Sequence, residues 1–191
     1  MIELICIGTL ITIVIIISDR KKSKKYRKKH KTPKQKGIEG ENVISNIIQY
    51  APMYKKIVRN AYIDMNENKK TEIDIIAIST KGIYVIESKN YEGWILGDEK
   101  SNQWCQNIYN KKSYFYNPIK QNQTHIKSIN KILQLDEKMY ESLIIFNKAE
   151  IKKMFVSSSR TYVMNIQKFR FYMSQQDKLQ DKITKEEVDR I

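Results

Sequence analysis

The sequence predicts a mixed α/β (α+β) domain behind a single membrane-spanning helix. Three observations support this fold class. Residues 1–17 are almost wholly apolar, and a dense run of basic residues follows them. Residues 71–78 and 83–89 have the length and the two-residue periodicity of β-strands, whereas residues 118–133 carry apolar side chains at helical spacing. With 191 residues, the chain can form one hydrophobic core of ordinary size with appendages.

Residues 1–18 are interpreted as a transmembrane anchor. The apolar run carries a single charged residue, Glu3, and is rich in β-branched side chains. It is short, because a spanning helix needs about 20 apolar residues. A secretory signal is the competing interpretation, but no basic residue precedes the run and no small-x-small cleavage site follows it. A buried core helix is disfavoured by the polybasic sequence that comes next.

Residues 19–36 are predicted to form a basic juxtamembrane linker. Eleven basic residues and no acidic one lie between Arg20 and Lys36, so the positive-inside rule places the following domain in the cytoplasm of a single-pass cell-membrane protein. The run can fix topology, contact anionic lipid headgroups or act as a nucleic-acid arm. Of the 35 basic and 21 acidic residues, residues 37–191 hold 24 and 19, so the domain itself is only mildly basic.

A helix is predicted to open near Gly37 and to end before Pro52. Its buried face is expected to hold Val43, Ile44, Ile47 and Ile48. Glu41 lies in the first turns of this predicted helix, where the helix dipole favours a carboxylate. That structural role alone is sufficient to explain Glu41.

The next elements are three strands, over residues 55–60, 71–78 and 83–89. In the second strand, Asp74 is expected on one face and Ile73 with Ile75 on the other. Gly82 is available for a positive φ in the turn before the third strand.

This hairpin brings Asp74 and Glu87 side by side, with Lys89 one pleat further along. Two adjacent carboxylates repel each other unless a cation or a proton intervenes, and Mg²⁺ prefers such oxygen ligands. A solvated cross-strand Glu–Lys pair is the alternative interpretation of Glu87 and Lys89.

The remaining chain is predicted to supply further strands and two helices. A strand within residues 90–97 and a hairpin over residues 103–116 are rich in aromatic and amide side chains, which either stack on bases or pack the far side of a sheet. Asn117 and Pro118 begin the next helix, with Ile126, Ile129, Ile132 and Leu133 as its buried stripe. Gln121 and His125 share a face of this helix.

Towards the C-terminus, residues 143–146 and 154–157 read as two core strands, and residues 162–172 include a short strand. A capping box at Thr184 predicts a final helix.

The predicted order of helix, three strands, helix and strand resembles the PD-(D/E)xK nuclease superfamily, which has an αβββαβ core. Four motifs are similar to those of the nuclease-related domain (NERD) family: Gly37-x-x-Gly40-Glu41, Thr71-Glu72-Ile73-Asp74, Ile86-Glu87-Ser88-Lys89-Asn90 and Asn117-Pro118-Ile119-Lys120-Gln121. The resemblance implies a restriction-endonuclease-like core with a central mixed sheet over residues 37–160. Residues 161–191 would then form a C-terminal extension with a short strand and a helix.

The resemblance also implies metal-dependent cleavage of phosphodiester bonds. Asp74 and Glu87 would hold Mg²⁺, for which Mn²⁺ can substitute, with the Ser88 carbonyl as an additional ligand. Glu41 would orient a metal-bound water or support a second ion. Such a site suits an anionic substrate, because a metal lowers the pKa of its bound water and offsets charge on the phosphorane.

In the same scheme, Lys89 positions or deprotonates the attacking water, or stabilises the transition state, and Gln121 orients water or phosphate. His125 is interpreted as structural or as a contact to the nucleic-acid backbone. The expected partner is nucleic acid, DNA in the first place, and a small domain that cuts both strands favours a homodimer. The alternative function is a non-catalytic module that holds nucleic acid or a protein at the membrane, since superfamily membership does not establish activity.

Overall fold

The computed structural model describes residues 31–66 and 69–191. The predicted transmembrane anchor, residues 1–18, lies outside this range. Within the described range, no helix has the length and hydropathy needed to cross a membrane. Residues 34–191 form one compact unit.

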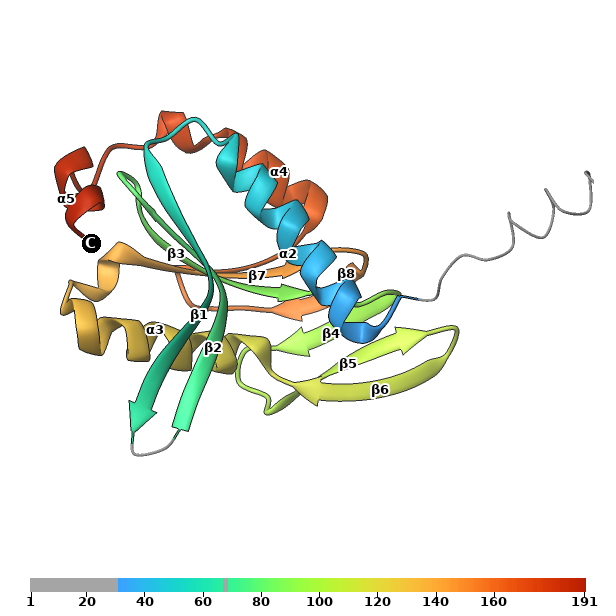
Figure 1. Cartoon of the computed structure of the whole chain (residues 1–191). Helices are drawn as coiled ribbons and strands as arrows, with labels where there is room; N and C mark the ends of the chain where they lie inside the picture. The colour runs from blue at the N-terminus through green and yellow to red at the C-terminus, as the bar shows by residue number, and fades with distance from the viewer. Residues whose placement is uncertain (1–30, 67–68) are drawn as a thin grey trace, which may run out of the picture. The chain divides into compact units, whose positions relative to one another are not determined.

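The unit contains helices and strands in an irregular alternation (Figure 1). In chain order they are α2 (Pro33–Gln49), β1 (Lys55–Asn66), β2 (Lys69–Ser79), β3 (Gly82–Lys89), β4 (Trp94–Asp98), β5 (Gln103–Ile108), β6 (Lys111–Tyr116), α3 (Pro118–Leu133), η1 (Glu137–Met139), β7 (Tyr140–Phe146), β8 (Glu150–Phe155), β9 (Thr161–Asn165), α4 (Ile166–Ser174), η2 (Gln176–Lys178) and α5 (Lys185–Arg190).

The described strands form two mixed sheets. The larger has the order β1-β2-β3-β7-β9, in which β1 to β3 are antiparallel neighbours and β7 and β9 continue in parallel to β3. The smaller has the order β6-β5-β4-β8, with β8 parallel to β4. The prediction of a mixed α/β fold with central mixed sheets is therefore confirmed.

Helices cover both faces of the larger sheet (Figure 1). Ile44 and Ile48 of α2 and Phe169 of α4 pack on one face, together with alternate residues of β2, β3 and β7. Ile129 of α3 and Val188 of α5 pack on the other face. Burial of these apolar side chains supplies the main stabilisation of the fold.

The predicted turn between β2 and β3 is present. Gly82 has a φ of +123°, and a Cβ at this position would lie 2.7 Å from the Met139 carbonyl oxygen, so only glycine fits. The helix that begins at Pro118 is capped by the Asn117 side chain, which accepts from the Ile119 N–H, and the predicted capping box of Thr184 with Glu187 opens α5.

The hairpin of β1 and β2 changes faces half-way along its length. Ile57 and Ala61 would share one face of a regular strand, yet Ile57 packs beneath α2 and Ala61 packs in the core beside α3. Ile75 and Ile73 of β2 divide in the same way, so the prediction that they share a face is wrong. At the crossover, Asn60 has a left-handed φ of +49° and is skipped in the pairing register.

Three other predictions of burial need correction. Val43 of α2 and Ile132 of α3 are exposed, because each helix buries a narrower stripe than its apolar residues suggest. Residues 154–157 do not form a strand of the main core. They overlap the end of β8, which belongs to the smaller sheet and exposes Phe155.

Candidate active site

The candidate site lies where β2 and β3 part. The ladder between these strands ends at the pair Ile75–Ile86, one residue before Asp74 on β2 and Glu87 on β3. Beyond that pair, the Asp74 carboxylate takes the place of a strand partner: its Oδ2 accepts a hydrogen bond of 2.8 Å from the Ser88 N–H. The two carboxylates therefore lie on adjacent strands just beyond the end of the ladder.

Glu87 is almost fully buried, with 2% of its surface exposed. Lys89 Nζ donates to Glu87 Oε1 at 2.6 Å, and His125 Nε2 lies 3.3 Å from Oε2. In the second contact, neither Oε2 nor Nε2 makes a hydrogen bond of good geometry. Burial alone would raise the pKa of Glu87, but the His125 ring and the Lys89 ammonium together lower it below its usual value.

Two residues of α3 reach the site, as their four-residue spacing predicts. Gln121 Oε1 accepts from Lys89 Nζ at 3.2 Å. His125 Nδ1 lies 2.9 Å from the Thr71 hydroxyl of β2, and the ring is buried. The imidazole thus bridges Thr71 and Glu87, which is a more specific position than the sequence indicated for it.

Asp74 has the opposite electrostatic environment to Glu87. Burial first, and then repulsion from the Glu87 carboxylate, raise the pKa of Asp74 to about 7, although the Ser88 hydrogen bond opposes the shift. The protonated form of Asp74 is therefore substantially populated near neutral pH. A bound cation would reverse this preference, because it attracts the ionised form.

Glu41 lies beside this pair without joining it. It is the ninth residue of α2, too far into the helix for the dipole at the N-terminus to explain it. Its Oε2 accepts from Asn60 Nδ2 at 3.2 Å and lies 3.6 Å from an Arg59 guanidinium nitrogen. Its charge nevertheless contributes to the raised pKa of Asp74.

The close approach of α2 to the sheet depends on Gly40. A Cβ at Gly40 would lie 2.4 Å from Asn147 Nδ2 and 3.3 Å from Ser88 Oγ. Asn147 in turn donates to Ser88 Oγ at 3.1 Å, and its backbone N–H donates to the Lys89 carbonyl at 3.0 Å. Gly40 thus lets α2 reach the chain segment that carries Ser88 and Lys89.

The residues present fit a hard divalent cation held with few protein ligands. Asp74 and Glu87 offer carboxylate oxygens, and Glu87 Oε2 is buried without a hydrogen-bond partner. Over residues 31–66 and 69–191, no three His, Cys, Asp or Glu side chains converge tightly enough to coordinate a metal. This arrangement suits Mg²⁺, which commonly uses one or two carboxylates and keeps several waters.

Comparison with known proteins agrees with the motifs. The nuclease-related domain family matches residues 36–147 of the chain. A Bacillus anthracis protein described as uncharacterized is 34% identical over 163 residues, which cover 85% of this chain and 72% of that protein. The chain belongs to the nuclease-related domain family. No solved structure shows a significant match.

The predicted membership of this family is thus confirmed. The matched segment contains every side chain proposed for the site, from Glu41 to Gln121. Sequence reasoning missed three contacts: Arg59 and Asn60 on Glu41, and Thr71 on His125. Only Asn60 carried a signal, since asparagine tolerates the left-handed conformation that it adopts here.

Proposed function

We propose that this chain is a Mg²⁺-dependent nuclease that hydrolyses phosphodiester bonds of nucleic acid, with DNA as the proposed substrate. The observation that supports this best is the coupled pair of Asp74 and Glu87 at the parting of β2 and β3. Membership of the nuclease-related domain family supports the same assignment. Around the larger sheet the elements follow the order α2, β1 to β3, α3 and β7, which is that of a restriction-endonuclease-like core, with β4 to β6 inserted before α3.

Asp74 and Glu87 would hold Mg²⁺ or Mn²⁺, with the Ser88 carbonyl as a further ligand. The bound ion would supply positive charge beside an anionic phosphodiester and increase the acidity of its water. Glu41, fixed by Arg59 and Asn60, would orient that water from the α2 side.

Lys89 and Gln121 form the polar wall of the site. The Lys89 ammonium has three donors, of which Glu87 and Gln121 take two, so one stays available for the attacking water or a phosphate oxygen. Because Gln121 accepts through Oε1, its amide NH₂ group is available to donate to the same ligand.

We also propose that residues 1–18 anchor the domain at the cytoplasmic face of the cell membrane. The apolar run and the eleven basic residues after it support this location. Homodimerisation is proposed on the ground that one small site cuts one strand at a time.

The test is a cleavage assay with the full chain and with its Asp74→Asn and Glu87→Gln variants. Labelled single- and double-stranded DNA and RNA are incubated with Mg²⁺, Mn²⁺ or EDTA. We expect cleavage that EDTA and either substitution abolish, whereas the control Glu137→Gln, at an exposed position in η1, cleaves normally. Intact substrates with every metal would refute the proposal.

One observation favours a second candidate, a non-catalytic module tethered to the membrane. Lys89 already forms an ion pair with Glu87, and the His125 ring packs against the same carboxylate, so Glu87 can be structural. A module of this kind would retard nucleic acid in a gel without cutting it, and Glu87→Gln would leave that retardation unchanged.

A further inference from the structure

The smaller sheet has one buried and one open face. Ile95, Trp104 and Phe115 point inward and pack against Phe146 of the main sheet. Residues that are paired across neighbouring strands point to the same face of a sheet. The face opposite to Trp104 and Phe115 is called the outer face. Its rows run from Trp94 through Asn107 to Lys112, and from Leu96 through Cys105 to Tyr114, with Tyr116 beside Gln103 and Phe155 beside Asp98.

Aromatic rings stand open on this outer face. Trp94 is 48% exposed, Tyr114 66%, Tyr116 57% and Phe155 58%. The sequence left open whether the aromatic residues of this region pack a core or contact a ligand. In the structure, Trp104 and Phe115 pack in the core, whereas the rings of Trp94, Tyr114, Tyr116 and Phe155 are exposed to solvent in the described part of the chain.

Lysines accompany the exposed rings. By their register Lys112 and Lys153 lie on the outer face, and Lys152, at the irregularity of β8, forms an ion pair with Glu150 at 2.7 Å. Lys152 Nζ lies 5.2 Å from the centre of the Trp94 ring, and Lys153 Nζ lies 5.6 Å from that of Phe155. On β6, every second residue lies on the outer face, namely Lys112, Tyr114 and Tyr116. The two tyrosines are therefore about 7 Å apart along the strand.

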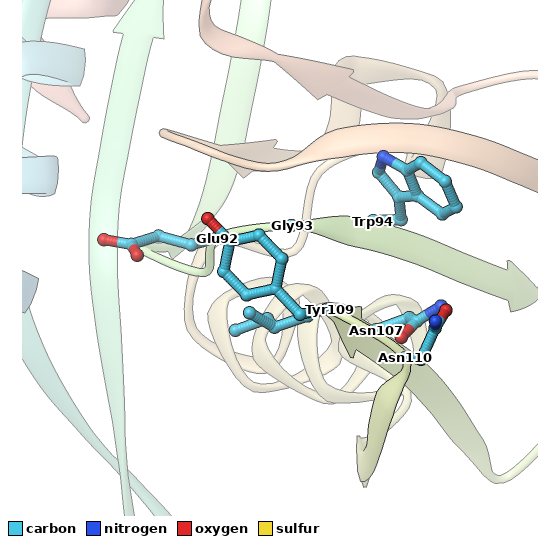
Figure 2. A pocket seen from close by; sticks show the side chains of 7 residues that line it. Glu92, Gly93, Trp94, Asn107, Tyr109 and Asn110 are labelled. Atoms are coloured by element: carbon cyan, nitrogen blue, oxygen red, sulfur yellow. The ribbon is translucent and has the colours of Figure 1, made fainter.

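At the Trp94 end, the sheet opens into a pocket of about 350 Å³. Figure 2 shows Trp94 and the amides of Asn107 and Asn110 on one side of this pocket and the Tyr109 ring on the other. The turn that carries Tyr109 and Asn110 has left-handed φ values of +47° and +65°, which project both side chains away from the hairpin. The pocket therefore combines aromatic faces with amide donors and acceptors, and Glu92, whose carboxylate lies 3.5 Å from Lys148 Nζ, also lines it.

We propose that the outer face binds single-stranded nucleic acid, with bases stacked on Trp94, Tyr114 and Tyr116 and lysines on the phosphates. Exposed rings interleaved with cations are the arrangement by which proteins hold single strands without regard to sequence. A duplex is not suited to this face, because its bases are already stacked on one another. The pocket beside Trp94 takes a base whose edge meets the amides of Asn107 and Asn110.

The position of the face links it to the candidate active site. Lys89 and Trp94 are five residues apart along the chain, so their Cα atoms lie within about 18 Å of each other. At the other side, β6 passes directly into α3, and Tyr116 precedes Gln121 by five residues (Figure 1). A strand held on the outer face can therefore continue to Lys89 and Gln121 at the candidate active site, which makes single-stranded nucleic acid, or a single-stranded end, the substrate class. This identification of the substrate rests on the proposed nuclease function.

The binding test uses the full chain in EDTA, where no metal-dependent cleavage can occur. The chain has two tryptophans, and Trp104 is 1% exposed, so quenching of fluorescence by an added oligonucleotide reports on Trp94. A fluorescent oligo-dT and a duplex of equal length are titrated by anisotropy. The variants are Tyr114→Ala, Tyr116→Ala and the double variant, and Tyr50→Ala, at an exposed tyrosine beyond α2, is the matched control.

We expect oligo-dT to bind more tightly than the duplex, to quench Trp94 and to slow the alkylation of Cys105, followed by peptide mass spectrometry. Each tyrosine substitution on the face should weaken binding about fivefold or more, and Tyr50→Ala should not. Unchanged affinity in the double variant would overturn the proposal. The proposal would also be overturned if oligo-dT left the alkylation rate of Cys105 unchanged and anionic vesicles, or self-association that is lost on dilution, slowed it instead.

The two proposals can fail separately. Binding in EDTA that depends on Tyr114 and Tyr116, without cleavage in Mg²⁺, would retain the nucleic-acid face and refute the nuclease. Cleavage of duplex and single strand at equal rates, unaffected by the double tyrosine variant, would retain the nuclease and refute the face.

Discussion

The most direct test of the carboxylate pair is Asp74→Asn in the metal-free protein. The amide has the shape of the carboxylate and its oxygen can still accept from the Ser88 N–H, so the substitution removes the charge alone. In the folded protein, burial and the Glu87 carboxylate raise the pKa of Asp74 from 3.8 to about 7. The folded protein therefore binds this proton more tightly than the unfolded chain does.

The sign of the effect follows from this difference. As the pH rises from about 4 to about 7, the unfolded chain loses the proton first, so ionisation of Asp74 progressively lowers the free energy of unfolding of the parent protein. Each pH unit in this window is worth about 1.4 kcal/mol. Between pH 5 and pH 8, the Asn variant should therefore gain about 2–3 kcal/mol of stability relative to the parent, with no further gain above pH 8.

Urea unfolding followed by circular dichroism, in EDTA and over this pH range, measures the difference. Adding Mg²⁺ at pH 8 should then stabilise the parent protein and leave the Asn variant unchanged, because the ion binds the folded state through the carboxylates. Parallel stability curves of parent and variant across the pH range would refute the raised pKa of Asp74. Equal stabilisation of both by Mg²⁺ would place the ion elsewhere.

Three further predictions concern Glu99, Gly40 and His125. Glu99 accepts hydrogen bonds from the hydroxyl and backbone N–H groups of Ser158 and Ser157, which lower its pKa to about 2. Glu99→Gln should therefore lower the free energy of unfolding by about 1 kcal/mol in urea at pH 7. The difference in stability between parent and variant should shrink as the pH falls from 4.5 towards 2, because Glu99 of the parent becomes protonated. Gly40→Ala should destabilise the fold by about 1–3 kcal/mol in thermal unfolding, since its Cβ would displace Asn147. His125→Ala should remove a contact that lowers the pKa of Glu87, so Mg²⁺-induced stabilisation should require a higher pH.

The pairing of Asp74 with Glu87 could be predicted because it depends on local chain geometry. Once Gly82 defines the turn, the antiparallel register follows by counting residues, and it places these two carboxylates opposite each other. Gln121 and His125 were predictable for a similar reason, since residues four apart in a helix share a face. Each inference needs only the period of one element.

The contacts of Glu41 and His125 could not be predicted, because they join segments that are distant in the sequence. Nothing in the helix that carries Glu41 indicates Arg59 as its partner, and nothing near His125 indicates Thr71. The face change at Asn60 was missed because a period of two assumes a regular strand. Where β1 and β2 cross from one core to the other, that assumption fails for Ile73.

The parting of β2 and β3 gives Asp74 two roles that must be separated in any experiment. Beyond the pair Ile75–Ile86 the Ser88 N–H has lost its strand partner, and Asp74 supplies the acceptor. Truncation to alanine would remove this acceptor as well as the charge, and a buried donor without a partner costs about 1–3 kcal/mol. That loss opposes the gain from relieving the repulsion with Glu87. Loss of cleavage in an alanine variant would thus reflect either a missing metal ligand or a displaced Ser88, whereas the asparagine variant tests the ligand by itself.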